Sequence, residues 1–221
     1  SRAMSELKPP ATRRTPARKA RASRDDQVSD RRRSLMVAAV KVISKKGLTG
    51  VTINSIAAEA KCSYGVVAFH FKSKEGVIFA ALDHTAAEYE AYLGKLAASA
   101  LGPADRIRSM IDTDFSSKAA GRSSIALWLS FWAEAARVTS YRKRCASLRD
   151  QYNQAVAADI AELAAQRGVT VDAPQLALSL NAMISGLWIE GLLSPAPLAE
   201  VQQRGHAACL ALMRGPFPQD F

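Results

Sequence analysis

Apolar residues recur at helical spacing along most of this 221-residue chain. A stripe of four predicts a first helix from about Ser29 to Lys46; it consists of Leu35, Ala39, Val42 and Ile43. From Lys74 onward the same spacing continues, with breaks where Gly, Pro, Ser or Thr gather. No segment shows the sustained alternation typical of a strand. The pattern therefore predicts an all-α fold of about nine helices.

Two short apolar repeats, separated by a tight break, lie between Thr52 and Lys74. Thr52 and Ser63 precede the repeats, and each hydroxyl can cap a helix by accepting a bond from a first-turn amide. Because only Lys61 and Cys62 separate the helices, the two must cross steeply. Such a pair is a helix-turn-helix, whose second helix can enter a DNA major groove. A plain helical hairpin is the alternative.

The distribution of charge favours DNA binding over a hairpin. Residues 1–77 contain 17 Lys and Arg against 6 Asp and Glu, whereas residues 78–221 contain 13 against 14. Nearly all the positive excess therefore lies on the part that holds the helix pair, as a polyanionic partner would require. Arg31, Arg32 and Arg33 fall in the first turn of the predicted first helix, where the helix dipole disfavours cations. This placement suggests an external anion such as the DNA backbone.

Composition divides the chain into three parts. Residues 1–27 contain eight Lys and Arg and almost nothing apolar, so we expect a disordered basic arm. The arm acts either as a solubilising tail or as a DNA contact that follows phosphates or enters a minor groove. Residues 28–77 form the predicted DNA-binding domain. Residues 78–221 form a larger helical domain for ligand binding and dimerisation, joined to the first by a long helix from about Lys74 to Ala100.

The last two predicted helices, about Ala173 to Leu193 and Ala196 to Met213, are very apolar for terminal elements. Exposed, their faces would favour aggregation, whereas two-fold pairing into a four-helix bundle would bury them. The residues assigned to this homodimer interface are Leu176, Leu180, Met183, Ile184, Leu187, Leu198, Val201 and Leu210. A symmetric dimer also places two DNA-binding domains about one DNA turn, or a small multiple, apart.

Aromatic residues cluster in two helices of the second domain. Aromatic side chains three and four residues apart on one helix pack together in many cores, which is the first interpretation. The second is a cage for a quaternary or protonated amine, each ring contributing roughly 0.5–2 kcal/mol. Glu134 or Glu190 would pair with the cation in such a cage. The residues assigned to ligand binding are Trp128, Phe131, Trp132, Tyr152, Trp188 and Glu190.

Nothing in the sequence indicates an enzyme, a metal centre or a cofactor. The chain lacks GxSxG, P-loop, HExxH and GxGxxG motifs. Cys62, Cys145 and Cys209 lie far apart, as reduced thiols of a cytoplasmic protein would. Asp112 and Asp114 are two residues apart, so they do not share a helix face. We find no signal peptide, and the longest apolar stretch is too polar to span a membrane.

The first domain resembles the N-terminal domain of TetR-type transcriptional repressors. The residues that carry the resemblance are Thr52, Ile56, Ala57, Ala60, Ser63, Gly65, Phe71, Lys74, Glu75 and Val77. Two departures are Lys61, where the family usually has Gly, and an aromatic residue shifted relative to Val67. The resemblance implies a repressor that binds a palindromic double-stranded DNA operator as a dimer.

The resemblance also assigns DNA contacts by position. Thr52 and Ser63 would present hydroxyls and helix N-terminal amides to phosphates. The residues assigned to base edges are Tyr64, Gly65, Ala68 and Phe69, whose apolar surface suits thymine methyl groups. The residues assigned to the far edge of the contact are His70, Lys72 and Lys74.

The second domain has a weaker resemblance, to BetI-like regulators that respond to choline. It rests on the segments 126–133 and 185–189, although Ser185 stands where such proteins often have an acidic residue. The resemblance implies a small cationic or amphipathic effector of the choline type. A DNA-binding or architectural protein that needs no ligand is the alternative.

Overall fold

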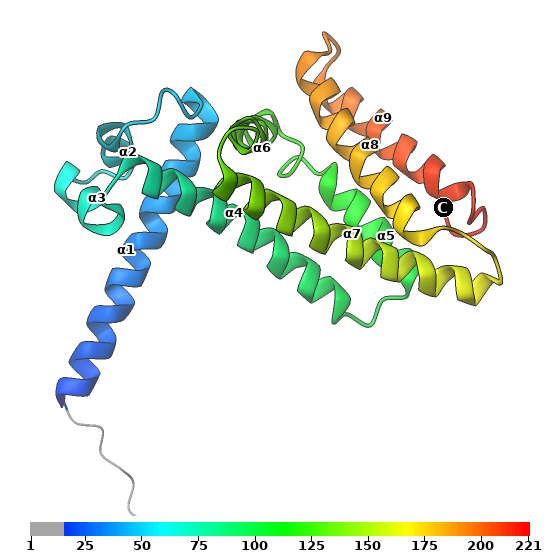
Figure 1. Cartoon of the computed structure of the whole chain (residues 1–221), viewed down its shortest axis with the longest axis horizontal. Coiled ribbons are helices and arrows are strands. Elements are labelled where there is room, and N and C mark those ends of the chain that lie inside the picture. Colours follow the sequence, from blue (N-terminus) through cyan, green and yellow to red (C-terminus); the bar gives the residue numbers. More distant parts are fainter. Residues whose placement is uncertain (1–15) are drawn as a thin grey trace, which may run out of the picture.

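All regular structure in the computed structural model, which describes residues 16–221, is helical (Figure 1). Nine helices occur within these residues: α1 (Pro16–Lys46), α2 (Ile53–Glu59), α3 (Tyr64–Phe71), α4 (Lys74–Ala97), α5 (Pro103–Asp114), α6 (Arg122–Ala135), α7 (Thr139–Arg167), α8 (Ala173–Leu193) and α9 (Leu198–Arg214). The predicted all-α fold of about nine helices is therefore confirmed.

Helix α1 is longer than the sequence pattern predicted. It begins at Pro16, so residues 16–27, predicted as part of a disordered arm, are helical; residues 1–15 lie outside the described part. The prediction considered only the lack of apolar residues in this segment. Ala, Arg, Lys and Gln are strong helix formers, and the packed half of α1 supplies the nucleus that an isolated helix lacks. From Ser23 to Ser34 the helix is exposed and projects from the body of the protein (Figure 1).

Helices α1, α2, α3 and the start of α4 form a small head. The predicted stripe of α1 is buried in it, and Leu35 and Ala39 are fully inaccessible. The turn between α2 and α3 is a Schellman motif: the Cys62 amide donates to Ala57 O at 2.9 Å and the Lys61 amide to Ala58 O at 3.2 Å. This compact turn gives the crossing pair predicted from the sequence.

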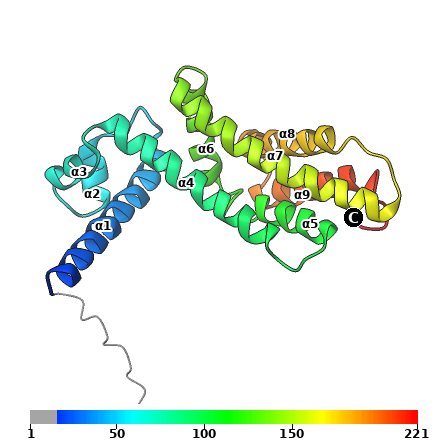
Figure 2. The same cartoon turned by 60° about the horizontal axis from the view of Figure 1, so that its bottom comes forward.

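Helix α4 connects the head to the body of the protein (Figures 1 and 2). Ser73 caps it by accepting the Gly76 amide at 3.0 Å. Farther along, Arg144 of α7 binds α4 at two points, through Asp83 at 2.8 Å and Glu90 at 2.6 Å. The Arg144 guanidinium lowers the pKa of Glu90 below its ordinary value. These ion pairs connect α4 to α7 along the body of the protein.

The hydrophobic core of the head continues into the body. Leu127 and Phe131 of α6 and Tyr141 and Cys145 of α7 are buried in the same cluster as the core of α1 to α4. The second cluster lies among the end of α4, α5, α7, α8 and α9. The predicted boundary at residue 77 therefore separates a positively charged part of the chain from a nearly neutral part. It does not separate two independent hydrophobic cores.

Helices α8 and α9 pack side by side at the end of the molecule opposite α3 (Figures 1 and 2). Of the residues assigned to a dimer interface, Leu180, Ile184 and Val201 are buried within the protomer itself, so they cannot form that interface. Because α8 is apolar on nearly every face, its sequence did not show which face points outward. The other assigned residues are partly buried: Leu176, Met183, Leu187, Leu198 and Leu210.

The outward face of α8 instead carries Leu178, Ile189 and Leu193, which are 48%, 39% and 77% exposed. In length and hydropathy α8 alone, among the described helices, meets the criteria of a membrane span. Its inner face packs against α7 and α9, as expected for a core helix of a globular protein.

Candidate DNA-binding head and ligand pocket

Helix α3 presents an exposed aromatic face at the outer end of the head. Tyr64 is 54% exposed and Phe69 is 76% exposed, whereas Val67 and Phe71 on the opposite face are buried. Gly65 lies on the exposed face, and a Cβ atom there would meet only the Ser63 hydroxyl oxygen, at 3.9 Å. The fold itself therefore does not require glycine at this position, and the predicted close approach of the Gly65 backbone to DNA remains a prediction.

The two predicted caps differ in the structure. Thr52 accepts the Ser55 amide at 3.0 Å, and Ser55 returns the bond to the Thr52 amide at 2.9 Å, which completes a capping box. Ser63 occupies the N-cap position of α3 but forms no capping hydrogen bond through its side chain. The prediction that its hydroxyl caps α3 is therefore wrong. This exposed hydroxyl keeps its hydrogen-bonding capacity for a partner at the start of α3.

The end of α3, where His70 was predicted to contact DNA, is held by a residue of α1. Arg32 of α1 donates to the His70 carbonyl oxygen at 2.7 Å, and its guanidinium lies 4.3 Å from the centre of the Phe71 ring. Burial and the charges of Arg32 and Arg31 lower the pKa of His70. Near neutral pH, His70 can therefore donate a hydrogen bond but contributes no charge.

The arginine cluster of α1 has a different position from the predicted one. Because α1 begins at Pro16, Arg31, Arg32 and Arg33 lie in the middle of the helix. The unfavourable helix dipole of a first turn therefore does not act on them. Arg32 fixes α1 to the end of α3, whereas Lys72 remains exposed and Lys74 is half-buried. Lys72 and Lys74 are therefore the cations of the predicted far edge.

A pocket in the body lies where α4, α5, α6, α7 and α8 meet. It is lined by Tyr89, Asp114, Trp128, Leu148, Arg149, Tyr152, Asn181, Ile184, Ser185 and Trp188. Three of the residues predicted to bind a ligand, Trp128, Tyr152 and Trp188, are thus brought together. Its volume is about 70 Å³, below the roughly 300–1,000 Å³ of drug-sized ligand sites. A ligand would therefore have to widen the pocket.

Asp114 is the buried carboxyl group of this pocket, with 2% of its surface exposed. Tyr89 donates its hydroxyl to one carboxyl oxygen at 2.9 Å, and Tyr152 donates to the other at 3.1 Å. Trp188 donates its indole N–H to the Asp114 carbonyl oxygen at 2.8 Å. Burial raises the pKa of Asp114 to about 7, against the effect of the two tyrosine hydroxyls. A cation beside it would favour the ionised form.

The other predicted ligand residues lie outside the pocket. Phe131 is fully inaccessible and belongs to the first hydrophobic cluster. Trp132 stacks between Trp128 and Trp188, with ring centres 6.4 Å apart in each pair. Trp132 therefore packs against two of the residues that line the pocket without lining it itself. Part of the aromatic cluster is therefore core, as the first interpretation predicted, and the amine cage of the second remains a prediction for the part that lines the pocket.

Neither predicted glutamate lies in the pocket. Glu190 is exposed, because two residues along a helix place it on the face opposite Trp188. Glu134 forms an ion pair with Arg137 at 2.9 Å, away from the pocket. Asp114 is the carboxyl group that lines the pocket instead, and the sequence carried a signal for its burial: Asp114 completes the i, i+3, i+4, i+7 apolar stripe of α5. The other three members of that stripe are Ile107, Met110 and Ile111.

Arg149 adds a hydrogen-bond donor to the opposite part of the pocket. Its guanidinium donates to the Ser185 hydroxyl at 3.3 Å and lies 5.8 Å from the Trp132 ring centre. The pocket thus offers a carboxyl group among aromatic rings and, separately, a cationic donor. Within residues 16–221, no group of three or more His, Cys, Asp or Glu side chains could hold a metal ion.

Two family models match this chain. The model for the BetI-type transcriptional repressor C-terminal domain matches residues 103–213, and that for bacterial regulatory proteins of the tetR family matches residues 35–81. The chain is 31% identical to the HTH-type transcriptional regulator BetI of Escherichia coli, over 77% of this chain and 86% of that protein. It is 27% identical to BetI of Paraburkholderia phytofirmans, over 76% of this chain and 84% of that protein.

Solved structures share the fold. A transcriptional regulator from Saccharomonospora viridis in complex with choline has a TM-score of 0.71 at 23% identity, covering 81% of this chain and 95% of that one. A TetR transcription regulator from Haloarcula marismortui has a TM-score of 0.75 at 18% identity, covering 85% and 98%. At these identities the likeness concerns the arrangement of helices.

Proposed function

Because this chain belongs to the TetR family of transcriptional regulators and has a BetI-type C-terminal domain, we propose that it represses transcription by binding a palindromic operator as a homodimer. We further propose that a small cationic effector of the choline type changes its affinity for the operator. Its family and relatives are regulators of transcription and not enzymes. It would act in the cytoplasm, where bacterial DNA lies.

The observation that carries the proposal for the effector is the Asp114 pocket. A buried carboxyl group accepting two tyrosine hydroxyls, with indoles alongside, can offer both an anion and ring faces to an ammonium group. Choline also carries a hydroxyl group, for which Arg149 and Ser185 provide hydrogen-bonding partners. The choline complex of the similar Saccharomonospora viridis regulator makes choline the first compound to test.

Helix α4 supports a mechanism that links the pocket to the head. Tyr89 of α4 binds Asp114 in the pocket, and the same helix begins immediately after α3 in the head. A ligand that widens the pocket would displace Tyr89 and therefore α4. The ligand shifts the population of head positions only by its preference for the wider pocket. Operator affinity then changes by the same coupling free energy.

A titration of choline and tetramethylammonium against tryptophan fluorescence tests the effector. We expect choline to bind the wild type, and Asp114→Asn to weaken binding at least about tenfold, because the anion is lost. Asp112→Asn is the matched control, since Asp112 is an exposed carboxylate on the same helix. Weaker binding of tetramethylammonium would show that the hydroxyethyl group of choline contributes to binding, as the proposed contact with Arg149 and Ser185 requires. If neither ligand binds and neither alters operator affinity, the ligand-independent alternative is favoured.

Operator binding is tested by salt dependence with two variants of the head. Lys74→Ala should weaken binding to all DNA sequences alike and reduce the slope of log K against log salt by about one. Phe69→Ala should reduce the preference for operator over unrelated DNA, because an apolar base contact is lost. An unchanged salt slope would remove Lys74 from the phosphate contacts, and an unchanged preference would remove Phe69 from the base contacts.

A further inference from the structure

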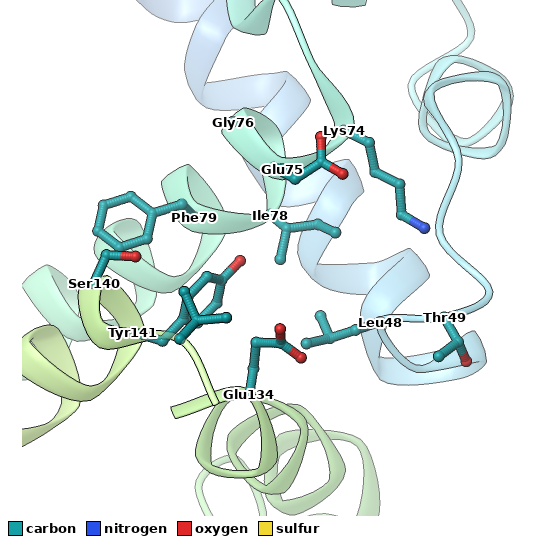
Figure 3. Close-up of a pocket in the computed structure, with 11 residues that line it drawn as sticks. Leu48, Thr49, Lys74, Glu75, Gly76, Ile78, Phe79, Glu134, Ser140 and Tyr141 are labelled. Carbon is teal, nitrogen blue, oxygen red and sulfur yellow. The ribbon is translucent and has the colours of Figure 1, made fainter. Parts of the chain in front are cut away.

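A second hollow lies between the head and the body, apart from the Asp114 pocket. It is bounded by the residues that follow α1, by the first two turns of α4, and by the junction of α6 and α7 (Figure 3). Its volume is about 540 Å³, within the range of small-molecule sites. We call it the interdomain groove. None of the residues that line it lines the Asp114 pocket.

Two carboxylates from different helices line the interdomain groove. Glu75 comes from the first turn of α4 and Glu134 from the end of α6, and they approach it from opposite sides (Figure 3). Lys74 is the single cation among its lining residues and extends toward Thr49 (Figure 3). Glu134 also pairs with Arg137 at 2.9 Å, but Arg137 does not line the groove, so the lining residues carry two carboxylates against one ammonium group.

Tyr141 supplies a polar group that has no partner within the described residues. Its side chain is 7% exposed, it forms no hydrogen bond through its hydroxyl to residues 16–221, and that hydroxyl points into the groove between the two carboxylates (Figure 3). Burial and the charges of Glu134 and Glu75 raise the pKa of Tyr141 to about 12. The hydroxyl therefore remains protonated and can accept a hydrogen bond from an ammonium group.

Aromatic surface completes the wall of the groove. Phe79 lines it beside Tyr141, with ring centres 5.5 Å apart and the rings at 79°. Such rings attract a cation that lies over a face. Leu48 and Ile78 provide apolar surface for the carbon atoms of an organic ion.

We propose that the interdomain groove binds a small organic ammonium ion. The carboxylates of Glu75 and Glu134 would pair with it and the Tyr141 hydroxyl would accept one of its N–H groups. An anion would have only Lys74 among the lining residues to offset two carboxylates, and a neutral apolar molecule would desolvate the Glu75 carboxylate without compensation. Because the walls belong to both the head and the body, the bound ion would hold α4 against the α6–α7 junction. This site is independent of the effector proposed for the Asp114 pocket.

Isothermal titration of the full chain with 1,4-diaminobutane tests the site, since this probe carries one ammonium group for each carboxylate of the lining. We expect binding with a millimolar or lower Kd, weakened about tenfold by Glu134→Gln and by Glu75→Gln. Tyr141→Phe should weaken it by a smaller factor. Glu88→Gln, an exposed carboxylate of α4 outside the groove, should leave the Kd unchanged.

Two comparisons separate this site from the Asp114 pocket. Asp114→Asn should leave the Kd for 1,4-diaminobutane unchanged, and Glu134→Gln should leave choline binding unchanged. Lack of 1,4-diaminobutane binding to the wild type would overturn the proposal. Wild-type affinity in both Glu134→Gln and Glu75→Gln would overturn it as well. Loss of 1,4-diaminobutane binding in Asp114→Asn would assign the diamine to the other pocket and would also overturn it.

Discussion

Lys61 has a backbone conformation that lysine rarely adopts. Its φ is 53°, in the left-handed region, because it is the C′ residue of the Schellman motif that ends α2. Helices commonly use Gly at this position because a Cβ atom is unfavourable there. Lys61, which stands where the family usually has Gly, is thus a site of local backbone strain in the turn between α2 and α3.

Lys61→Gly should therefore stabilise the protein, although glycine also increases the entropy of the unfolded chain. The net gain should be about 0.5–1 kcal/mol. Urea unfolding of Lys61→Gly and Lys61→Ala measures it. The alanine variant retains the Cβ atom and should gain nothing, so equal stabilisation by both would contradict the role of the left-handed conformation.

Asp114 should make stability depend on pH. Its pKa is raised from 3.8 to about 7 by burial, so the folded state binds more protons than the unfolded state between these values. The free energy of unfolding should therefore fall as pH rises through this window, by up to about 4 kcal/mol. Urea unfolding between pH 4 and pH 8 would show this loss in the wild type relative to Asp114→Asn. Parallel curves for the two proteins would contradict it.

The helical spacing of α5 indicates that Asp114 is buried, but the partners of its carboxyl group were not predictable from local sequence. Tyr89 and Tyr152 are 25 and 38 residues from Asp114 in the chain, and only the packing of α4, α5 and α7 brings them together. The exposed face of α3 was predictable, because helical spacing places Phe69 on the side opposite the buried Val67 and Phe71.

At the scale of elements, the junction of α3 and α4 requires glycine at residue 76. A Cβ atom on Gly76 would lie 2.5 Å from the Phe71 carbonyl oxygen, which is part of the backbone and cannot move freely. Gly76→Ala should therefore cost about 1–3 kcal/mol and displace α3. Gly94→Ala is the matched control, since a Cβ atom there meets nothing within 4 Å on the same helix.

Thermal and urea unfolding measure both glycine variants. Gly94→Ala should stabilise α4 by about 0.5–1 kcal/mol through helix propensity. Gly76→Ala should also lose operator affinity if α3 moves. Equal stability of the two variants would show that the close approach to Phe71 is relieved without cost.

Helices were predicted well where the signal was local, and of the two predicted caps Thr52 was right and Ser63 was wrong. The bounds of α4 and α8 agree closely with the expected ones, since spacing and flanking Ser, Gly or Pro residues define them. The start of α1 was missed because residues 16–27 carry no apolar stripe to count. Helix propensity and attachment to a packed helix determined that start, and neither appears in a hydrophobic pattern.

For the whole molecule, we expect the outward face of α8 to form the dimer interface. Leu178 and Ile189 are exposed there on a helix at the end opposite the head. Leu178→Glu combined with Ile189→Glu should give a monomer by sedimentation analysis, because two carboxylates would be buried at a two-fold contact. Leu180 is buried in the protomer, so its substitution should unfold the chain instead.

The matched control for this interface lies at the exposed end of α1. Val28→Glu places a similar charge on a residue that is 45% exposed and remote from α8 and α9, and it should remain dimeric. A wild-type monomer at micromolar concentration, or an unchanged dimer in the double variant, would exclude this face as the interface.

The stacked indoles also make the protein its own optical reporter. All three tryptophans of the chain belong to one stack across α6 and α8, and the rings of Trp132 and Trp188 lie within 10° of parallel. Their electronic transitions must therefore couple, and every change in intrinsic indole emission originates at this one cluster. The head contains no tryptophan, so indole emission reports a motion of the head only when that motion changes the surroundings of this stack.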